Sequence, residues 1–309
     1  MRSFLFVPGD SIRKFESAKK TAADALILDL EDSIAPDQKV VARSITREML
    51  DSRNPSQKMY IRVNALDTGM ILADLAAVMP GRPDGIVLPK CAGAADVNHL
   101  ALYLEAFEAA SNLAQGTTRI VVVATETARA VLKLLDFEGA SPRLWGMMWG
   151  AEDLAASLGA SRNRTAGRFH GPFLLARDLC LISAAAAGVV AIDTIATDID
   201  DLVALRDESI AARHDGFLSK AIIHPKHVDI VNAAFMPSDE EIAWSQKVVK
   251  AFDDNPNSGV VKLDGKMLDK PHLRAAEKSP RTSQTPGLKN TPDYAVVIIP
   301  ESALSVRLC

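Results

Sequence analysis

The chain has 309 residues, 48% of them hydrophobic, which is enough for a full globular core and excludes a largely disordered protein. Its net charge is −4 and its basic residues are scattered, which argues against nucleic acid as the main partner. The three cysteines lie far apart without a CxxC pair, so neither a zinc site nor a disulfide framework is expected. A reducing, cytoplasmic location is expected instead. No apolar run approaches the ~18 residues of a membrane span.

Short β-prone runs alternate with longer helix-compatible segments along most of the chain. The predicted strands lie at 3–7, 25–30, 59–63, 85–89, 119–124, 144–149, 190–195 and 218–223. The predicted helices between them lie at 12–23, 39–51, 70–79, 94–113, 127–136, 172–187 and 199–213. Eight βα units of about 30 residues favour a TIM (β/α)8 barrel. An open doubly wound sheet is the alternative, but Val7-Pro8-Gly9-Asp10 does not supply the glycine-rich turn that such a sheet uses for dinucleotides.

Beyond the eighth strand the sequence predicts a helical extension to the barrel rather than a second domain. A helix is expected at 238–252, with Ser238 and Glu241 forming a capping box. Asp264-Gly265 is typical of a turn. Pro, Ser and Thr become frequent from residue 279, as in flexible linkers. The expected parts are a barrel at 1–235, an extension at 236–278 and a tail at 279–309.

Carboxylates follow two neighbouring strands of the predicted barrel. Glu126 comes after the run 120–124, and Asp153 comes after the run 144–149. Carboxylates gathered at one mouth of a barrel are costly unless a cation neutralises them. Two carboxylates completed by waters and substrate oxygens are the usual way to hold Mg²⁺. The alternative for Asp153 is that it caps the following helix.

Arg62 lies inside an apolar strand, where a charge is rarely buried without a partner. At a barrel mouth its planar fork can bind a substrate carboxylate. Alternatively it pairs with Asp29, Glu31 or Asp32 from the neighbouring strand, and both roles can hold together. Glu31 and Asp32 are expected to orient Arg62 or metal-bound waters, with a solvated loop as the alternative.

Four further residues could take part in chemistry. Arg13 and Lys14 follow the turn after the first strand and could meet phosphates or a carboxylate, although such charges are often only solvating. His224, before Pro225, is either a base or a positioning residue in an extended backbone. Asp269 lies beyond the Asp264-Gly265 turn and could begin the final helix.

Nine short motifs follow one another along residues 2–277. They are Arg2-Ser-Phe-Leu-Phe-Val-Pro-Gly9, Leu28-Asp-Leu-Glu-Asp32, Ile61-Arg-Val-Asn64, Leu88-Pro-Lys90, Thr125-Glu-Thr127, Gly150-Ala-Glu-Asp-Leu154, Ala191-Ile-Asp-Thr194, Ile223-His-Pro225 and Leu263-Asp-Gly-Lys-Met-Leu-Asp269. With these motifs in this order, the chain resembles the citrate lyase beta-subunit-like group of the HpcH/HpaI aldolase superfamily. Two departures are the long connection Ser161 to Pro172, which leaves the substrate open, and the tail from Ser279, which matches nothing in the group.

The resemblance implies a TIM barrel, Mg²⁺, a homotrimer and carbon–carbon cleavage or formation on malyl-, citramalyl- or citryl-thioesters, with an acyl-CoA and a 2-oxo acid as products. It implies that Glu126 and Asp153 bind the metal and that Arg62 binds the substrate carboxylate. The residues implied to line the substrate site are Phe6, Arg13, Arg62, Glu126, Ile223 and His224. Asp269 matches a catalytic aspartate that reaches a neighbouring subunit's site.

The resemblance leaves three activities open. In a lyase, Asp269 would exchange a proton with the carbon of a thioester enolate. If Asp269 instead activates water, the same site would be a thioesterase. A third alternative is the citryl-acyl-carrier-protein lyase subunit of a citrate lyase complex, in which the thioester is carried by a protein.

Overall fold

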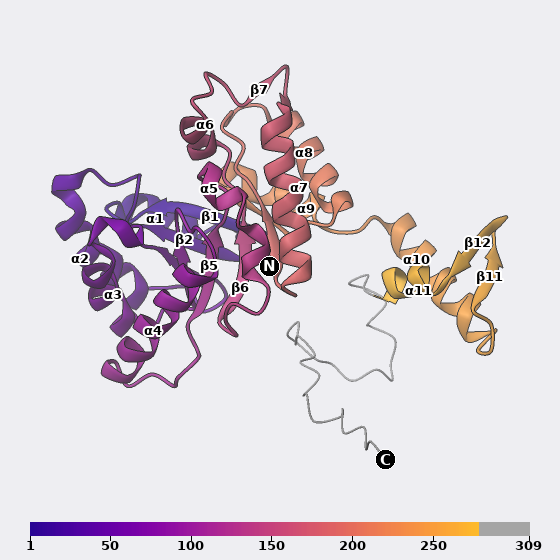
Figure 1. Cartoon of the computed structure of the whole chain (residues 1–309), viewed down its shortest axis with the longest axis horizontal. Helices are drawn as coiled ribbons and strands as arrows, with labels where there is room; N and C mark the ends of the chain where they lie inside the picture. The colour runs from indigo at the N-terminus through magenta and orange to yellow at the C-terminus, as the bar shows by residue number, and fades with distance from the viewer. Residues whose placement is uncertain (278–309) are drawn as a thin grey trace, which may run out of the picture. The chain divides into compact units, whose positions relative to one another are not determined.

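In the computed structural model, which describes residues 1–277, eight parallel strands close into a barrel (Figure 1). The strands are β1 (Ser3–Pro8), β2 (Ala25–Asp29), β3 (Lys58–Arg62), β4 (Gly85–Leu88), β5 (Arg119–Val123), β6 (Leu144–Met148), β9 (Val190–Asp193) and β10 (Ser219–Ile222). Their order around the barrel is β1-β10-β9-β6-β5-β4-β3-β2. Each of the eight lies within a predicted strand segment or one residue beyond it, so the TIM barrel prediction is confirmed.

Helices between the strands cover the outside of the barrel. They are α1 (Ile12–Lys19), α2 (Lys39–Asp51), α3 (Ile71–Val78), α4 (Ala94–Ala110), α5 (Ala128–Val131), α6 (Glu152–Leu158), α7 (Gly171–Ala186), α8 (Leu202–Asp215) and α9 (Val228–Ala234). The 3-10 turns are η1 (Pro36–Gln38), η2 (Leu66–Thr68), η3 (Met79–Gly81), η4 (Leu134–Phe137) and η5 (Pro225–His227).

The prediction of one continuous helix at 127–136 was wrong. The segment instead forms one turn of α-helix, α5, and a separate 3-10 turn, η4. Ala130, Leu134 and Phe137 are buried in this arrangement. Their spacing also fits a single helix, so the apolar pattern does not reveal the break.

Two apolar layers position the strand ends. Alternate strand residues point into the barrel, where Phe4, Ile27, Tyr60, Val121 and Ile192 belong to one buried cluster. Their neighbours along the strands face the helices in a second, larger cluster. Fully burying an aliphatic or aromatic side chain contributes about 1.5–3 kcal/mol. These layers therefore supply the rigid frame on which the loops at the carboxyl ends of the strands are built.

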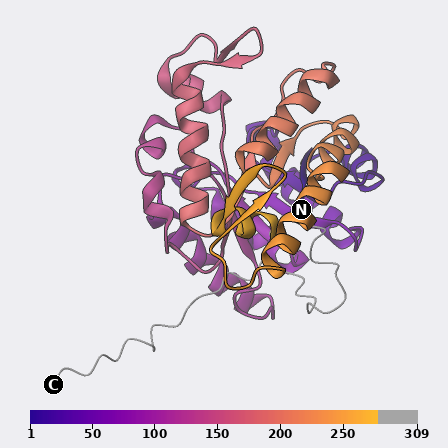
Figure 2. The ribbon, with the colours of Figure 1, turned by 90° about the vertical axis from the view of Figure 1, so that its right-hand side faces the viewer.

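An unpredicted hairpin interrupts the long connection between β6 and α7. It consists of β7 (Arg164–Thr165) and β8 (Arg168–Phe169), and both views show it projecting beyond the first turn of α7 (Figures 1 and 2). Its two turn residues, Ala166 and Gly167, have φ of 48° and 78°. Positive φ at both positions is what a tight hairpin turn requires. Alanine is not a usual residue there, so the sequence did not signal the turn.

The chain divides into two units, the first ending at Phe235 and the second beginning at Met236. The second contains α10 (Asp239–Asp253), β11 (Val260–Leu263), β12 (Lys266–Asp269) and α11 (Lys270–Glu277). The predicted capping box at Ser238 and Glu241 is present. The β11–β12 hairpin turns at Asp264 and Gly265, where a turn was predicted. This unit is therefore not purely helical.

The second unit has a small apolar core of its own. Val248 and Phe252 of α10 pack with Val261 and Leu268 of the hairpin and with Ala276 of α11. The predicted tail at 279–309 lies outside the described residues. Among residues 1–277, no helix is long and apolar enough to cross a membrane.

Candidate active site at the carboxyl ends of the barrel strands

Arg62 is held by carboxylates from the neighbouring strand. The β2–β3 register places Asp29 opposite Arg62. Asp29 accepts from Nε and Nη2 of Arg62 at 2.7 Å each, and Glu31 lies 3.1 Å from Nη1. Of the three pairing partners considered from the sequence, the structure therefore shows Asp29 and Glu31. The guanidinium also lies over the Phe6 ring, 4.9 Å from its centroid.

The charge on Asp29 is stabilised by this arrangement. Burial alone would raise the pKa of Asp29, but hydrogen bonds and the charge of Arg62 hold that pKa below its ordinary value. The backbone N–H groups of Glu31 and Ser33 also donate to Asp29, at 2.9 and 3.2 Å. Asp29 therefore fixes both the arginine and the loop that carries Glu31 and Asp32.

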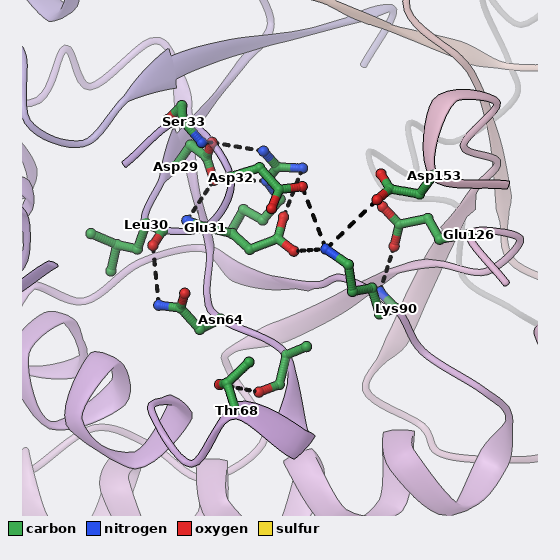
Figure 3. A network of polar contacts seen from close by, with 12 residues as sticks. Asp29, Leu30, Glu31, Asp32, Ser33, Asn64, Thr68, Lys90, Glu126 and Asp153 are labelled. Carbon is green, nitrogen blue, oxygen red and sulfur yellow. Dashed lines mark hydrogen bonds and ion pairs between the residues drawn. The ribbon is translucent and has the colours of Figure 1, made fainter. Parts of the chain in front are cut away.

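Lys90 links the carboxylates on the two sides of the site (Figure 3). Its Nζ forms an ion pair with Glu31 and lies 3.4 Å from Asp32 and 3.8 Å from Asp153. Its backbone N–H donates to Glu126. From the sequence, Lys90 was recognised only as part of the motif Leu88-Pro-Lys90. Its position directly after a predicted strand was the available signal.

Glu126 and Asp153 lie beside each other but differ in exposure (Figure 3). Glu126 is only 3% exposed, and burial followed by the charges of Asp153 and Glu31 raises its pKa to about 8. The Asp153 side chain is 38% exposed. α6 begins at Glu152, so Asp153 lies in its first turn and is not its N-cap. The capping alternative is therefore not what the structure shows.

These two carboxylates fit a hard divalent cation. Within residues 1–277, no group of three or more His, Cys, Asp and Glu side chains is arranged to hold a metal by itself. Glu126 and Asp153 would need waters and ligand oxygens to complete a coordination sphere. Mg²⁺ is usually held in this way, by one or two carboxylates and several other oxygens.

A cavity of about 600 Å³ opens beside these residues within the barrel unit. The predicted substrate residues Phe6, Arg13, Arg62, Glu126, Ile223 and His224 all line it, together with Asp153. The structure thus brings the predicted residues of the barrel into one place, while their roles stay predictions. Glu31 and Asp32 are connected to this site through Arg62 and Lys90.

His224 adopts the extended backbone expected before a proline, with φ of −140°. Its Nδ1 accepts the backbone N–H of Lys226 at 3.3 Å. Burial, followed by the charges of Lys226 and His227, lowers the pKa of His224. Because Nδ1 of His224 already accepts a backbone N–H of the next turn, the structure favours the positioning role over the role of a base.

Asp269 belongs to the second unit. It is the last residue of β12, and its Oδ1 lies 2.6 Å from Nδ1 of His272 on α11. Both side chains are half exposed. An exposed carboxylate beside a histidine is suited to proton transfer. Because α11 begins at Lys270, the expectation that Asp269 begins the final helix was wrong by one residue.

Comparison with known proteins places this geometry in a family. Residues 2–225 match the HpcH/HpaI aldolase/citrate lyase family. The chain is 35% identical over 285 residues to the (3S)-malyl-CoA thioesterase of Cereibacter sphaeroides, covering 90% of this chain and 93% of that protein. It is 32% identical over 280 residues to the citrate lyase subunit beta of Escherichia coli, covering 89% and 90%.

A solved structure extends the likeness to three dimensions. CitE from Mycobacterium tuberculosis, in complex with magnesium, acetoacetate and coenzyme A, has a TM-score of 0.75 and 34% identity, covering 89% of this chain and 95% of that one. The resemblance inferred from the motifs is thereby confirmed. The chain belongs to the HpcH/HpaI aldolase/citrate lyase family.

Proposed function

We propose that the protein is a Mg²⁺-dependent carbon–carbon lyase. Its substrate is a 3-hydroxy-dicarboxylic acyl-CoA thioester of the malyl-, citramalyl- or citryl-CoA type, and its products are an acyl-CoA and a 2-oxo acid. The observation that carries the proposal is one cavity lined together by Glu126, Asp153 and Arg62. The magnesium, acetoacetate and coenzyme A bound by the related CitE support it.

Each of these residues has a role that follows from its contacts. Glu126 and Asp153 hold Mg²⁺, which when bound stabilises negative charge on substrate oxygens as a Lewis acid. Arg62, kept in place by Asp29, binds the carboxylate that becomes part of the 2-oxo acid and adds positive charge where negative charge develops. Arg13 and Lys14, which also line the cavity, attract the phosphates of coenzyme A.

The reaction also needs a proton. When the carbon–carbon bond breaks, the hydroxyl group gives its proton to solvent water and becomes the carbonyl of the 2-oxo acid. The electron pair of the broken bond passes to the thioester part, which leaves as an enolate. Asp269 delivers a proton to the enolate carbon, giving the acyl-CoA. In the proposed homotrimer Asp269 comes from a neighbouring subunit, and its contact with His272 fixes the orientation of its carboxyl group.

A thioesterase is the second candidate, because the Cereibacter sphaeroides relative is a (3S)-malyl-CoA thioesterase. In that case Asp269 activates water, which attacks the thioester carbonyl and releases coenzyme A and a free dicarboxylic acid. The similarity to a citrate lyase subunit beta keeps a protein-bound citryl thioester as a further alternative.

Mass spectrometry of the full-length protein with Mg²⁺ and malyl-, citramalyl- or citryl-CoA separates these activities. A lyase yields a shorter acyl-CoA and a 2-oxo acid in equal amounts, whereas a thioesterase yields free coenzyme A and an intact hydroxy acid. Glu126→Gln is the matched inactive control. If none of the three is cleaved or hydrolysed, the coenzyme A assignment is wrong.

A further inference from the structure

Lys90 is in contact with four acidic residues of the site. Its ammonium group lies between Glu31 and Asp32 on one side and Asp153 on the other, while its backbone N–H holds Glu126 (Figure 3). The proposed function gives Lys90 no role, although it is the one lysine that Figure 3 places among these carboxylates.

The backbone of Lys90 is held in an unfavourable conformation. Its φ is +52°, in the left-handed region where residues other than glycine and asparagine are uncommon. This conformation allows the same residue to donate its N–H to Glu126 and to send its side chain to Glu31. Strain that is maintained in this way is often found at functional sites.

We propose that Lys90 is an internal counter-ion that competes with Mg²⁺ for Asp153. In the metal-free protein the ammonium group of Lys90 partly neutralises Asp153. When Mg²⁺ binds, the ammonium group loses its contact with Asp153 but keeps its contacts with Glu31 and Asp32. This inference rests on the proposed metal site at Glu126 and Asp153. It makes Lys90 a positioning residue that sets the affinity of the site for its metal.

The physical reason is electrostatic repulsion. A divalent cation bound by Asp153 must share that carboxylate with an ammonium whose nitrogen is 3.8 Å from Oδ1. Like charges this close repel strongly in a partly buried site, because solvent screens them less than in water. Lys90 therefore weakens binding of the free metal ion. An anionic 2-oxo acid would offset the excess positive charge, so metal and ligand should bind more tightly together than separately.

The test is calorimetric titration of full-length, metal-free protein with Mg²⁺, in the absence and presence of pyruvate as the 2-oxo acid probe. Lys90→Met should lower the Kd for Mg²⁺ about ten-fold and reduce the stimulation by pyruvate. Lys90→Arg, which keeps the charge, should stay within about three-fold of the wild type. Lys58→Met is the matched control, since it removes the same charge from an exposed pair with Asp84 at the start of β3, and should change nothing.

A purely structural lysine would give the opposite sign, because loss of its contacts would disorder the carboxylates and weaken metal binding. Unchanged or weaker binding by Lys90→Met therefore overturns the inference. Lys90→Asn, which also lacks the charge but tolerates positive φ, is the second variant should Lys90→Met not fold. If wild-type protein binds no Mg²⁺, or if Glu126→Gln binds it equally well, the proposed metal site itself is wrong and the inference falls with it. If those two results are as proposed and only the lysine variants disagree, the fault lies with Lys90 alone.

Discussion

The two proposed metal ligands, Glu126 and Asp153, differ in how firmly they are held. Glu126 is buried and accepts a hydrogen bond from the backbone N–H of Lys90, whereas Asp153 lies partly exposed in the first turn of α6. Such a pair combines one rigid ligand with one that can adjust when ligands exchange. Their position at one mouth of the barrel was predictable from the sequence, because the carboxyl ends of barrel strands lie at the same end.

We expect Glu126→Gln and Asp153→Asn each to reduce Mg²⁺-dependent turnover by at least about 100-fold without unfolding the barrel, since each replaces a metal-binding carboxylate with an amide of equal size. Turnover should be measured beside Mg²⁺ affinity and the thermal unfolding midpoint. Full wild-type activity in excess chelator would contradict the metal role.

The variant Arg62→Lys tests whether the proposed binding of a substrate carboxylate by Arg62 depends on the geometry of the side chain or only on its charge. Lysine keeps the charge but lacks the planar guanidinium group, which donates two hydrogen bonds to Asp29. Arg62→Lys should weaken binding of a 2-oxo acid by about ten-fold or more and leave coenzyme A binding within about three-fold. Calorimetry with each ligand separately measures both values. An equal loss for the two ligands would point to a general disturbance of the site.

The contacts of Lys90 could not be predicted from the sequence. A lysine after a strand and a proline has no preferred partner in the sequence alone. Its role depends on a positive φ and on carboxylates from three other loops, and both are consequences of the closed barrel. Arg62 was easier, because a charge inside an apolar strand already demands a partner.

At the scale of elements, β9 and β10 are joined by a buried ion pair that the sequence analysis did not recognise. Asp193 lies opposite Lys220 in the strand register, with 2.6 Å between Oδ2 and Nζ. Trp149, which follows β6, donates its indole N–H to Asp193 at 2.7 Å. The pair therefore fixes the start of the loop that leads to Asp153. From the sequence, Asp193 and Lys220 were placed in two separate apolar strands. Both side chains are buried, and nothing in the sequence of either strand identifies the other as its partner.

We expect Lys220→Met to destabilise the barrel by about 3 kcal/mol, because it leaves the buried Asp193 without its main counter-ion. The double variant Asp193→Asn with Lys220→Met should lose less than Lys220→Met alone, since no buried charge is left behind. Urea unfolding followed by tryptophan fluorescence gives both values. A loss below about 1 kcal/mol for Lys220→Met would mean that Trp149 and Arg177 suffice to hold Asp193.

Element prediction succeeded where one pattern dominated and failed where the chain bends locally. All eight barrel strands were found, because strands buried on both faces are continuous apolar runs. The β7–β8 hairpin and the break between α5 and η4 were missed. The break between α5 and η4 contains no glycine, proline or asparagine that would mark it. The β7–β8 turn contains Gly167 but has alanine, not asparagine or aspartate, before it.

At the scale of the whole molecule, the chain consists of a barrel unit and a second unit with its own core. The local pattern predicted a segment after the barrel, whereas its action at a neighbouring subunit's site was implied only by the family resemblance, because the position of one unit relative to another does not follow from local pattern. The proposed catalytic Asp269 belongs to this second unit, whereas the proposed metal ligands belong to the barrel.

This separation allows one decisive test of a shared site. If Asp269 serves the cavity of a neighbouring subunit, an Asp269→Ala protein and a Glu126→Gln protein should each be inactive, and mixing them under subunit exchange should restore activity. A mixed interface can join an intact metal pocket from one chain to an intact aspartate from the other. If the two chains pair at random in an equal mixture, up to roughly a quarter of the sites should be active. Turnover is measured before and after exchange, with exchange followed independently by mass spectrometry of differently tagged chains. The matched control is a mixture of Glu126→Gln with Asp153→Asn, whose defects lie in the same barrel and which should stay inactive. If exchange is complete and the first mixture is also inactive, Asp269 acts within its own chain or has no part in the reaction.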